Sequence, residues 1–158
     1  MHGLELIART QGSVISGYLP IRDELSPVPL LEALNAQDRI LVLPVIETKW
    51  APLIFRLWRP GDPLRNAGFG LREPLADRPL IPPDILLIPL AAFDSTGFRI
   101  GYGGGYYDRT LALYRAERMV AAIGIAYDEQ EVPSFIHSPH DQRLDYVITP
   151  AGVRIFGT

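Results

Sequence analysis

The chain has 158 residues, of which 47% are hydrophobic, and it carries 15 basic and 18 acidic side chains but no cysteine. Its length predicts a single compact domain over residues 1–158 that can bury a sizeable core. The net charge of -3 argues against broad nucleic-acid binding, which needs many basic residues to neutralise phosphates. The lack of cysteine excludes disulfides, thiolate metal sites and a cysteine nucleophile. Because no apolar run nears the length of a membrane span and no secretory leader is visible, we expect a cytoplasmic monomer with no membrane partner.

Apolar runs alternate with helical patterns along the chain. In chain order, the patterns predict a strand at 14–19, a helix at 27–35 with Ser26 as its N-cap, strands at 40–45, 53–58 and 85–88, a helix at 106–114, and strands at 120–125 and 144–148. This alternation predicts an α/β fold, a three-layer sandwich with a mostly parallel, Rossmann-like sheet. The Pro- and Gly-rich stretch 59–83 is too long for an ordinary connector, so we expect it to be functional or mobile.

The most informative segment is residues 93–109, which read FDSTGFRIGYGGGYYDR. Glycines let backbone amides approach an anion closely, and a strand, a glycine turn and a helix N-terminus together predict a phosphate site. A plain surface turn is the alternative, but the adjoining tyrosines and acidic-basic pair favour a site. The two common nucleotide fingerprints do not fit, because one ends in Gly-Lys-Ser/Thr and the other needs a glycine where Tyr106 stands.

Three polar segments follow predicted strands. They are residues 19–24, the glycine turn at 101–105, and residues 133–141. Ligands of open α/β sheets bind outside the carboxyl ends of the strands. We therefore expect these segments to meet at one edge of the sheet.

Residues 84–109 resemble the signature of the 5-formyltetrahydrofolate cyclo-ligase family, also called 5,10-methenyltetrahydrofolate synthetases. Further matches, in the family's order, are GYLPIRDE at 17–24, LPV at 43–45, GLREP at 70–74 and PHDQRLD at 139–145. The resemblance implies a fold similar to the NagB/RpiA/CoA-transferase-like group. It also implies ATP- and Mg²⁺-dependent cyclisation of 5-formyltetrahydrofolate to 5,10-methenyltetrahydrofolate, with release of ADP and phosphate.

The resemblance also implies roles for individual residues. ATP contacts are implied for Arg99, Ile100, Gly101, Tyr102, Gly103, Gly104, Gly105, Tyr106 and Tyr107. Folate contacts are implied for Leu19, Glu24, Tyr102, Gly103, Gly104, Gly105 and Tyr106. Arg99, Tyr106 and Asp108 would be catalytic, and Asp108 and Asp141 would hold Mg²⁺, which takes carboxylate oxygens together with substrate phosphates and water.

Some residues keep alternative interpretations. Asp108 is also placed to cap the helix that follows it. His137 and His140 make a zinc pair conceivable but have no cysteine support, and we interpret His140 as a solvated turn residue. Arg143 is a further candidate phosphate clamp. We interpret Trp50 and Trp58 as packing residues.

One departure concerns the beginning of the chain. Family members usually begin with a helical segment whose Lys and Arg reach the ATP phosphates, whereas residues 1–11 contain Arg9 but no lysine. Either the given sequence begins after that segment, or another basic residue takes over its role. The alternative function is therefore a folate- or nucleotide-binding protein of low activity.

Overall fold

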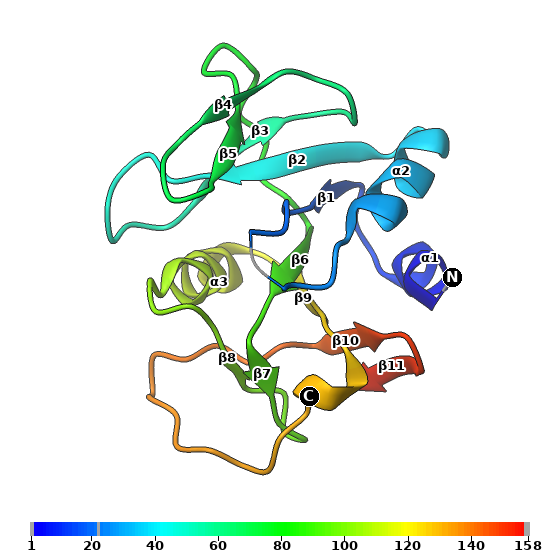
Figure 1. Cartoon of the computed structure of the whole chain (residues 1–158), viewed down its shortest axis with the longest axis vertical. Helices are drawn as coiled ribbons and strands as arrows, with labels where there is room; N and C mark the ends of the chain where they lie inside the picture. The colour runs from blue at the N-terminus through cyan, green and yellow to red at the C-terminus, as the bar shows by residue number, and fades with distance from the viewer. Residues whose placement is uncertain (1, 22, 157–158) are drawn as a thin grey trace.

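The computed structural model describes residues 2–21 and 23–156, so Arg22 of the GYLPIRDE motif lies outside the described residues. The helices are α1 (His2–Arg9), α2 (Val28–Ala36) and α3 (Tyr106–Glu117), with a 3-10 turn η1 (Asp128–Gln130). The central sheet contains β1 (Val14–Ser16), β2 (Ile40–Val45), β3 (Ile54–Leu57), β6 (Ile85–Pro89), β9 (Ala121–Ile125), β10 (Tyr146–Thr149) and β11 (Gly152–Ile155) (Figure 1). Two small hairpins pair β4 (Leu64–Asn66) with β5 (Arg72–Pro74), and β7 (Ala92–Phe93) with β8 (Arg99–Ile100).

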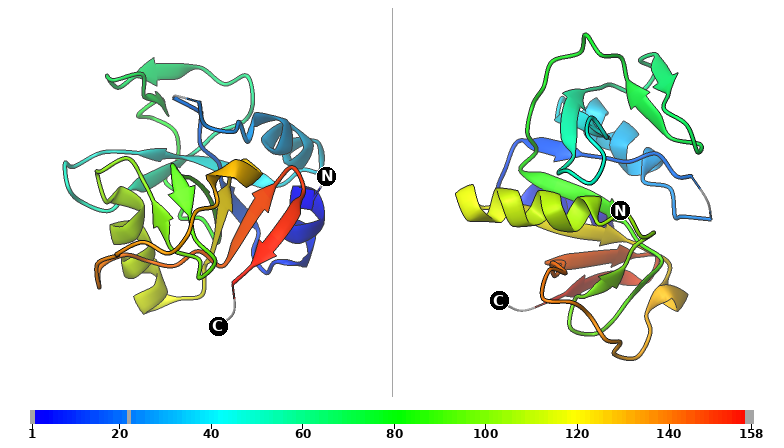
Figure 2. Two further views of the ribbon diagram at one scale, coloured as in Figure 1. Left: turned by 60° about the horizontal axis from the view of Figure 1, so that its bottom comes forward. Right: turned by 90° about the vertical axis from the view of Figure 1, so that its left-hand side faces the viewer.

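The seven strands of the central sheet lie in the order β11-β10-β9-β6-β1-β2-β3. The four inner pairs are parallel, and the edge strands β3 and β11 pair antiparallel with their neighbours. Hairpin β4–β5 stands beyond the β2–β3 end of the sheet, and β10 and β11 form the other end (Figure 2). The mostly parallel α/β sheet that the sequence predicts is confirmed.

Helices cover both faces of the sheet, which gives three layers. On one face, Ile7 of α1 and Leu31 and Leu34 of α2 pack with buried strand residues such as Leu41 and Leu87. On the other face, α3 packs through Leu111 and its tyrosines against a second buried cluster. Strands buried on both faces read as continuous apolar runs, which is why β6 was visible in the sequence. No helix in the described part of the chain is long and apolar enough to span a membrane.

The predicted element boundaries differ from the observed ones in instructive ways. The strand predicted at 14–19 ends at Ser16, although the Gly17 amide still donates to the Val42 carbonyl at 3.0 Å. The helix predicted from Pro27 begins at Val28, and its N-cap is Pro27 rather than the predicted Ser26, although the Val28 amide donates to the Ser26 hydroxyl at 3.2 Å. The strand predicted at 40–45 has the same bounds in the structure, and the remaining predicted strands shift by one or two residues at their ends.

The stretch 59–83 contains secondary structure that its composition did not predict. Hairpin β4–β5 lies within it, and Leu80 forms a further bridge to Arg56 of β3. Gly68, Phe69 and Gly70 turn the hairpin with positive φ values of 85°, 54° and 77°. The short strands were missed because Pro and Gly hide them from a hydrophobic-periodicity search.

Candidate active site

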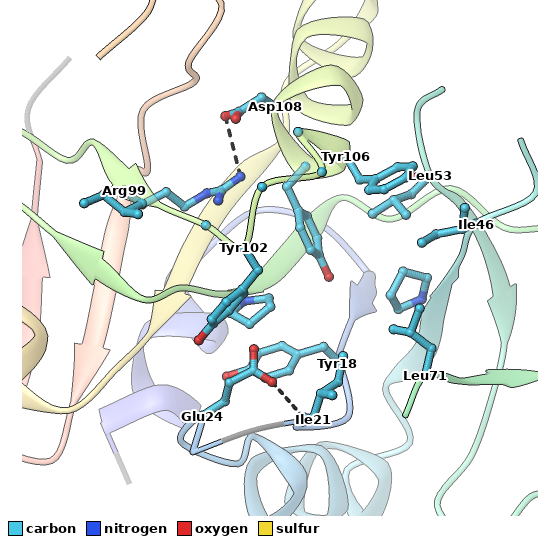
Figure 3. Close-up of a pocket in the computed structure, with 18 of the residues that line it drawn as sticks. Tyr18, Ile21, Glu24, Ile46, Leu53, Leu71, Arg99, Tyr102, Tyr106 and Asp108 are labelled. Carbon is cyan, nitrogen blue, oxygen red and sulfur yellow. Dashed lines mark hydrogen bonds and ion pairs between the residues drawn. The ribbon is translucent and has the colours of Figure 1, made fainter. Parts of the chain in front are cut away.

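A cavity of about 570 Å³ opens at the carboxyl ends of β1, β2 and β6 (Figure 3). Its position is the topological switch point of the sheet, because β1 has β2 on one side and β6 on the other. The segments after β1, β6 and β9 all contribute to its wall. The predicted convergence of the three polar segments is therefore confirmed.

Every site residue that the family resemblance implied lines this cavity. These residues are Leu19, Glu24, Arg99, Ile100, Gly101, Tyr102, Gly103, Gly104, Gly105, Tyr106, Tyr107, Asp108 and Asp141. Lining residues without a predicted role are Tyr18, Ile21, Leu43, Pro44, Ile46, Leu53, Leu71, Arg72, Glu73, Pro89, Phe135 and Ile136. The LPV and GLREP motifs mark Leu43, Pro44, Leu71, Arg72 and Glu73, of which Arg72 and Glu73 are charged.

The glycine turn takes a shape that only small residues allow. Gly103 and Gly105 have φ values of 99° and 68°, in the region where a side chain is strained. At Gly104 a Cβ atom would lie 2.6 Å from the Tyr106 ring. Gly105 is the N-cap of α3, and its carbonyl accepts the Arg109 amide at 3.1 Å. The turn therefore brings glycine backbone to the cavity directly before a helix N-terminus, which favours anions.

Arg99 is a nearly buried cation in the cavity wall. Its side chain is 6% exposed, its Nη2 lies 3.5 Å from Oδ1 of Asp108, and its Cζ lies 5.7 Å from the Tyr107 ring centre. Burial lowers the pKa of Arg99, and the nearby Asp108 carboxylate opposes that shift. Its Nε has no hydrogen-bond partner among residues 2–21 and 23–156. The guanidinium is therefore buried beside Asp108 without being fully hydrogen-bonded by the described residues.

Two carboxylates lie beside Arg99, and they come from distant parts of the chain. Oδ1 of Asp108 accepts the Gln142 amide at 3.0 Å, so the neighbouring Asp141 is held next to the start of α3. Oδ2 of Asp141 accepts the Ser138 amide at 2.7 Å. Each carboxylate has a second oxygen, and hard oxygen pairs of this kind suit Mg²⁺. In the described residues no three His, Cys, Asp or Glu side chains form a metal site alone, so substrate and water would complete the coordination.

The other end of the cavity is built from apolar walls and hydroxyls. The Tyr18 hydroxyl donates to the Leu25 carbonyl at 2.7 Å, and the Tyr102 hydroxyl donates to the Leu90 carbonyl at 3.1 Å. Oε1 of Glu24 accepts the Ile21 amide at 2.7 Å (Figure 3). Burial raises the pKa of Tyr18, and the Glu24 charge raises it further, so this hydroxyl stays neutral. We call this the hydroxyl end, and we call the region of Arg99, the glycine turn, Asp108 and Asp141 the charged end.

The remaining candidates lie outside the cavity lining. The His137 ring stacks on Phe98 with centroids 3.5 Å apart, and the His140 amide donates to the Ser138 hydroxyl at 3.0 Å. Nε of Arg143 donates to the Thr96 carbonyl at 2.8 Å. Arg9 lies on α1, where it forms an exposed ion pair with Glu5 at 3.9 Å.

Comparison with known proteins identifies the family of this chain. The family profile described as the 5-formyltetrahydrofolate cyclo-ligase family matches residues 1–150. A 5-formyltetrahydrofolate cyclo-ligase of Haemophilus influenzae is 37% identical over 137 residues, which cover 83% of this chain and 72% of the relative. One of Mycolicibacterium smegmatis is 33% identical over 158 residues, which cover 95% of this chain and 78% of the relative.

The solved structures that resemble this chain include 5,10-methenyltetrahydrofolate synthetases. The 5,10-methenyltetrahydrofolate synthetase of Aquifex aeolicus superposes with a TM-score of 0.75 at 27% identity, covering 93% of this chain and 73% of that one. The enzyme of Mycoplasma pneumoniae gives a TM-score of 0.69 at 27% identity, covering 92% of this chain and 77% of that one. The chain belongs to the 5-formyltetrahydrofolate cyclo-ligase family.

Proposed function

We propose that this chain catalyses the ATP-dependent cyclisation of 5-formyltetrahydrofolate to 5,10-methenyltetrahydrofolate, releasing ADP and phosphate. The observation that carries the proposal is that one cavity joins a charged end to an apolar, hydroxyl-lined end. A reaction between a polyphosphate and a flat heteroaromatic substrate needs a charged end for the phosphates and an apolar end for the ring. Family membership supplies the reaction type.

At the charged end, the chain would bind and orient the phosphates. Backbone amides of the glycine turn and the N-terminus of α3 would donate hydrogen bonds to phosphate oxygens. Arg99 would offset the charge of the transferring phosphoryl group through its guanidinium. Such positioning and charge neutralisation are the main protein contributions to phosphoryl transfer.

Asp108 and Asp141 would hold Mg²⁺. When bound there, the ion would neutralise charge on the phosphate oxygens. The Gln142 amide keeps Asp108 oriented, and the Ser138 amide does the same for Asp141.

At the hydroxyl end, the chain would bind the folate. The flat pterin ring suits the apolar walls, with Tyr102 and Tyr106 bounding the ring or its formyl group and Glu24 accepting from ring N–H groups. The formyl oxygen would attack the γ-phosphorus of ATP and displace ADP. N10 would then attack the activated formyl carbon, forming the C–N bond as phosphate leaves with the formyl oxygen and N10 loses its proton. This sequence needs no side-chain nucleophile.

The decisive test follows methenyltetrahydrofolate absorbance after mixing the 158-residue chain with 5-formyltetrahydrofolate, ATP and Mg²⁺. We expect product only when ATP is present. Ligand binding without product would favour the low-activity binding protein, and product without ATP would overturn the proposed reaction. A cytoplasmic monomer remains our prediction for location and assembly, to be tested by cell fractionation and light scattering.

A further inference from the structure

Trp50 lies behind the cavity wall rather than in it. Its side chain is 56% exposed, unlike Trp58, which is buried as expected at 5%. Its backbone adopts φ = 64°, a left-handed conformation that is uncommon for a bulky residue. Such conformations persist where the surrounding structure holds them in place. An exposed aromatic residue held in a strained conformation requires an explanation beyond core packing.

The Trp50 ring lies parallel to the ring of Tyr106, which lines the cavity. The two ring planes differ by 3° and the centroids are 6.3 Å apart, an offset stack. The Trp50 amide also donates to the Tyr106 hydroxyl oxygen at 3.4 Å. One residue therefore contacts both the face and the hydroxyl of the cavity tyrosine.

The segment that carries Trp50 is fastened to the first turn of α3. The Leu53 amide donates to the Thr110 hydroxyl at 2.8 Å, and this buried hydroxyl donates to the Tyr106 carbonyl at 2.7 Å. Residues 50–53 are thus linked to both the backbone and the side chain of Tyr106. Movement of Trp50 relative to α3 is limited at both ends of the segment.

Arg109 extends the same contacts to the glycine turn. Its guanidinium carbon lies 5.7 Å from the Trp50 ring centre, and its Nη1 donates to the Gly104 carbonyl at 2.6 Å. The Tyr106 ring itself packs directly against Gly104. Trp50 therefore reaches the glycine turn by two routes, through the Tyr106 ring and through the Arg109 guanidinium.

We infer that Trp50 is a positioning residue that sets the orientation of Tyr106 at the folate side of the cavity. This inference rests on the proposed function. Loss of the indole would let the tyrosine ring tilt away from the bound pterin, so folate binding would weaken more than ATP binding. Small misplacements of positioning groups have large kinetic effects.

The test uses Trp50→Gly and Trp50→Phe in the full chain. Glycine removes the ring and tolerates the left-handed backbone, so the Tm should hold while the folate KM rises about tenfold. The ATP KM should change less than half as much, and phenylalanine should restore most of the folate KM. Asp38→Gly is the matched control, since Asp38 has φ = 59° and does not line the cavity. It should leave both KM values unchanged.

A double variant decides whether Trp50 acts through Tyr106. In a Tyr106→Ala background, Trp50→Gly should cause no further rise in folate KM. Equal rises with and without Tyr106, or a Trp50→Gly variant with unchanged folate KM, would overturn the inference. If the wild-type chain forms no product, the proposed function fails, and the inference is then judged by the Kd of the same variants for 5-formyltetrahydrofolate, measured by titration. Absent binding or additive changes in Kd would overturn it, and non-additive changes would support the stack.

Discussion

Two Arg–Asp pairs lie at opposite ends of the central strands, and they are satisfied to different degrees. At the amino ends, Oδ1 of Asp84 accepts Nη1 of Arg118 at 2.8 Å, while its Oδ2 accepts the Ser13 and Val14 amides at 3.0 and 3.1 Å. Nη2 of Arg118 also donates to the Pro83 carbonyl at 2.6 Å. At the carboxyl ends, Arg99 and Asp108 are 3.5 Å apart.

The difference separates a structural clamp from a binding site. The Asp84–Arg118 pair joins the start of β1, the start of β6 and the end of α3, and its groups have partners within the protein. The Arg99–Asp108 pair is longer, lines the cavity, and includes a buried Nε that finds no partner among the described residues. Buried polar groups usually find partners, but the Arg99–Asp108 pair is less fully hydrogen-bonded within the described residues than the Asp84–Arg118 pair.

The largest expected effect comes from neutralising one carboxylate of each pair. Asp108→Asn should lower kcat/KM by about 10²–10³-fold, because it removes charge at the phosphate site, while the Tm stays near that of wild type. Asp84→Asn should lower the free energy of unfolding by about 1–2 kcal/mol and leave the kcat/KM of folded protein unchanged. Turnover assays of both variants measure kcat/KM, and urea denaturation measures their free energies of unfolding. Near-normal turnover of Asp108→Asn would remove Asp108 from the mechanism.

Replacing the arginines sharpens the comparison. Arg99→Lys keeps a positive charge but loses the planar donors, so the ATP KM should rise about tenfold or more. Arg118→Lys should leave the ATP KM unchanged and cost about 1 kcal/mol of stability through the lost second hydrogen bond. Initial rates over a range of ATP concentrations distinguish the two. An equal rise in ATP KM for both variants would contradict the assignment of Arg99 to the binding site and of Arg118 to a structural ion pair.

Two glycines extend the comparison to the backbone. Gly104→Ala should raise the folate KM about threefold to tenfold, because the new Cβ would lie 2.6 Å from the Tyr106 ring and displace it. Gly61→Ala is the control, since Gly61 has φ = 97° and a Cβ added there would meet no atom within 4 Å. It should cost about 1–2 kcal/mol of stability through backbone strain and leave the KM unchanged. If Gly61→Ala raised the folate KM instead, a general loss of stability, and not contact with Tyr106, would control folate binding.

The sequence predicted those elements that carry a pattern within their own short segment. The buried strands β2 and β6 are continuous apolar runs, and the glycine turn carries its own signal in sequence. The short strands of the two hairpins were missed because two or three residues are too few to show a period. The strand predicted at 144–148 is observed as β10 (Tyr146–Thr149), although the Asp145 amide still donates to the Ala122 carbonyl at 2.8 Å.

The site was predicted as a set of residues but not as a set of contacts. The Gln142 amide reaches Asp108 across 34 positions, and the Trp50 amide reaches Tyr106 across 56. Such pairs are brought together by the sheet topology, which no local period encodes. For the same reason Trp50 was interpreted as packing, although it stacks on a cavity residue.

Asp94 provides the mildest test, because hydrogen bonds from Thr96 and Phe98 satisfy this carboxylate. Burial alone would raise the pKa of Asp94, but hydrogen bonds from the Thr96 hydroxyl and from the Thr96 and Phe98 amides outweigh it and lower the pKa. A carboxylate whose folded pKa is depressed adds stability above its unfolded pKa of about 3.9, and that stability is lost as pH falls through the folded value. Thr96→Ala should therefore cost about 1 kcal/mol at pH 7 and progressively less below about pH 4. Urea denaturation between pH 7 and pH 3 measures the difference, and a cost independent of pH would mean that the hydroxyl does not act through the Asp94 charge.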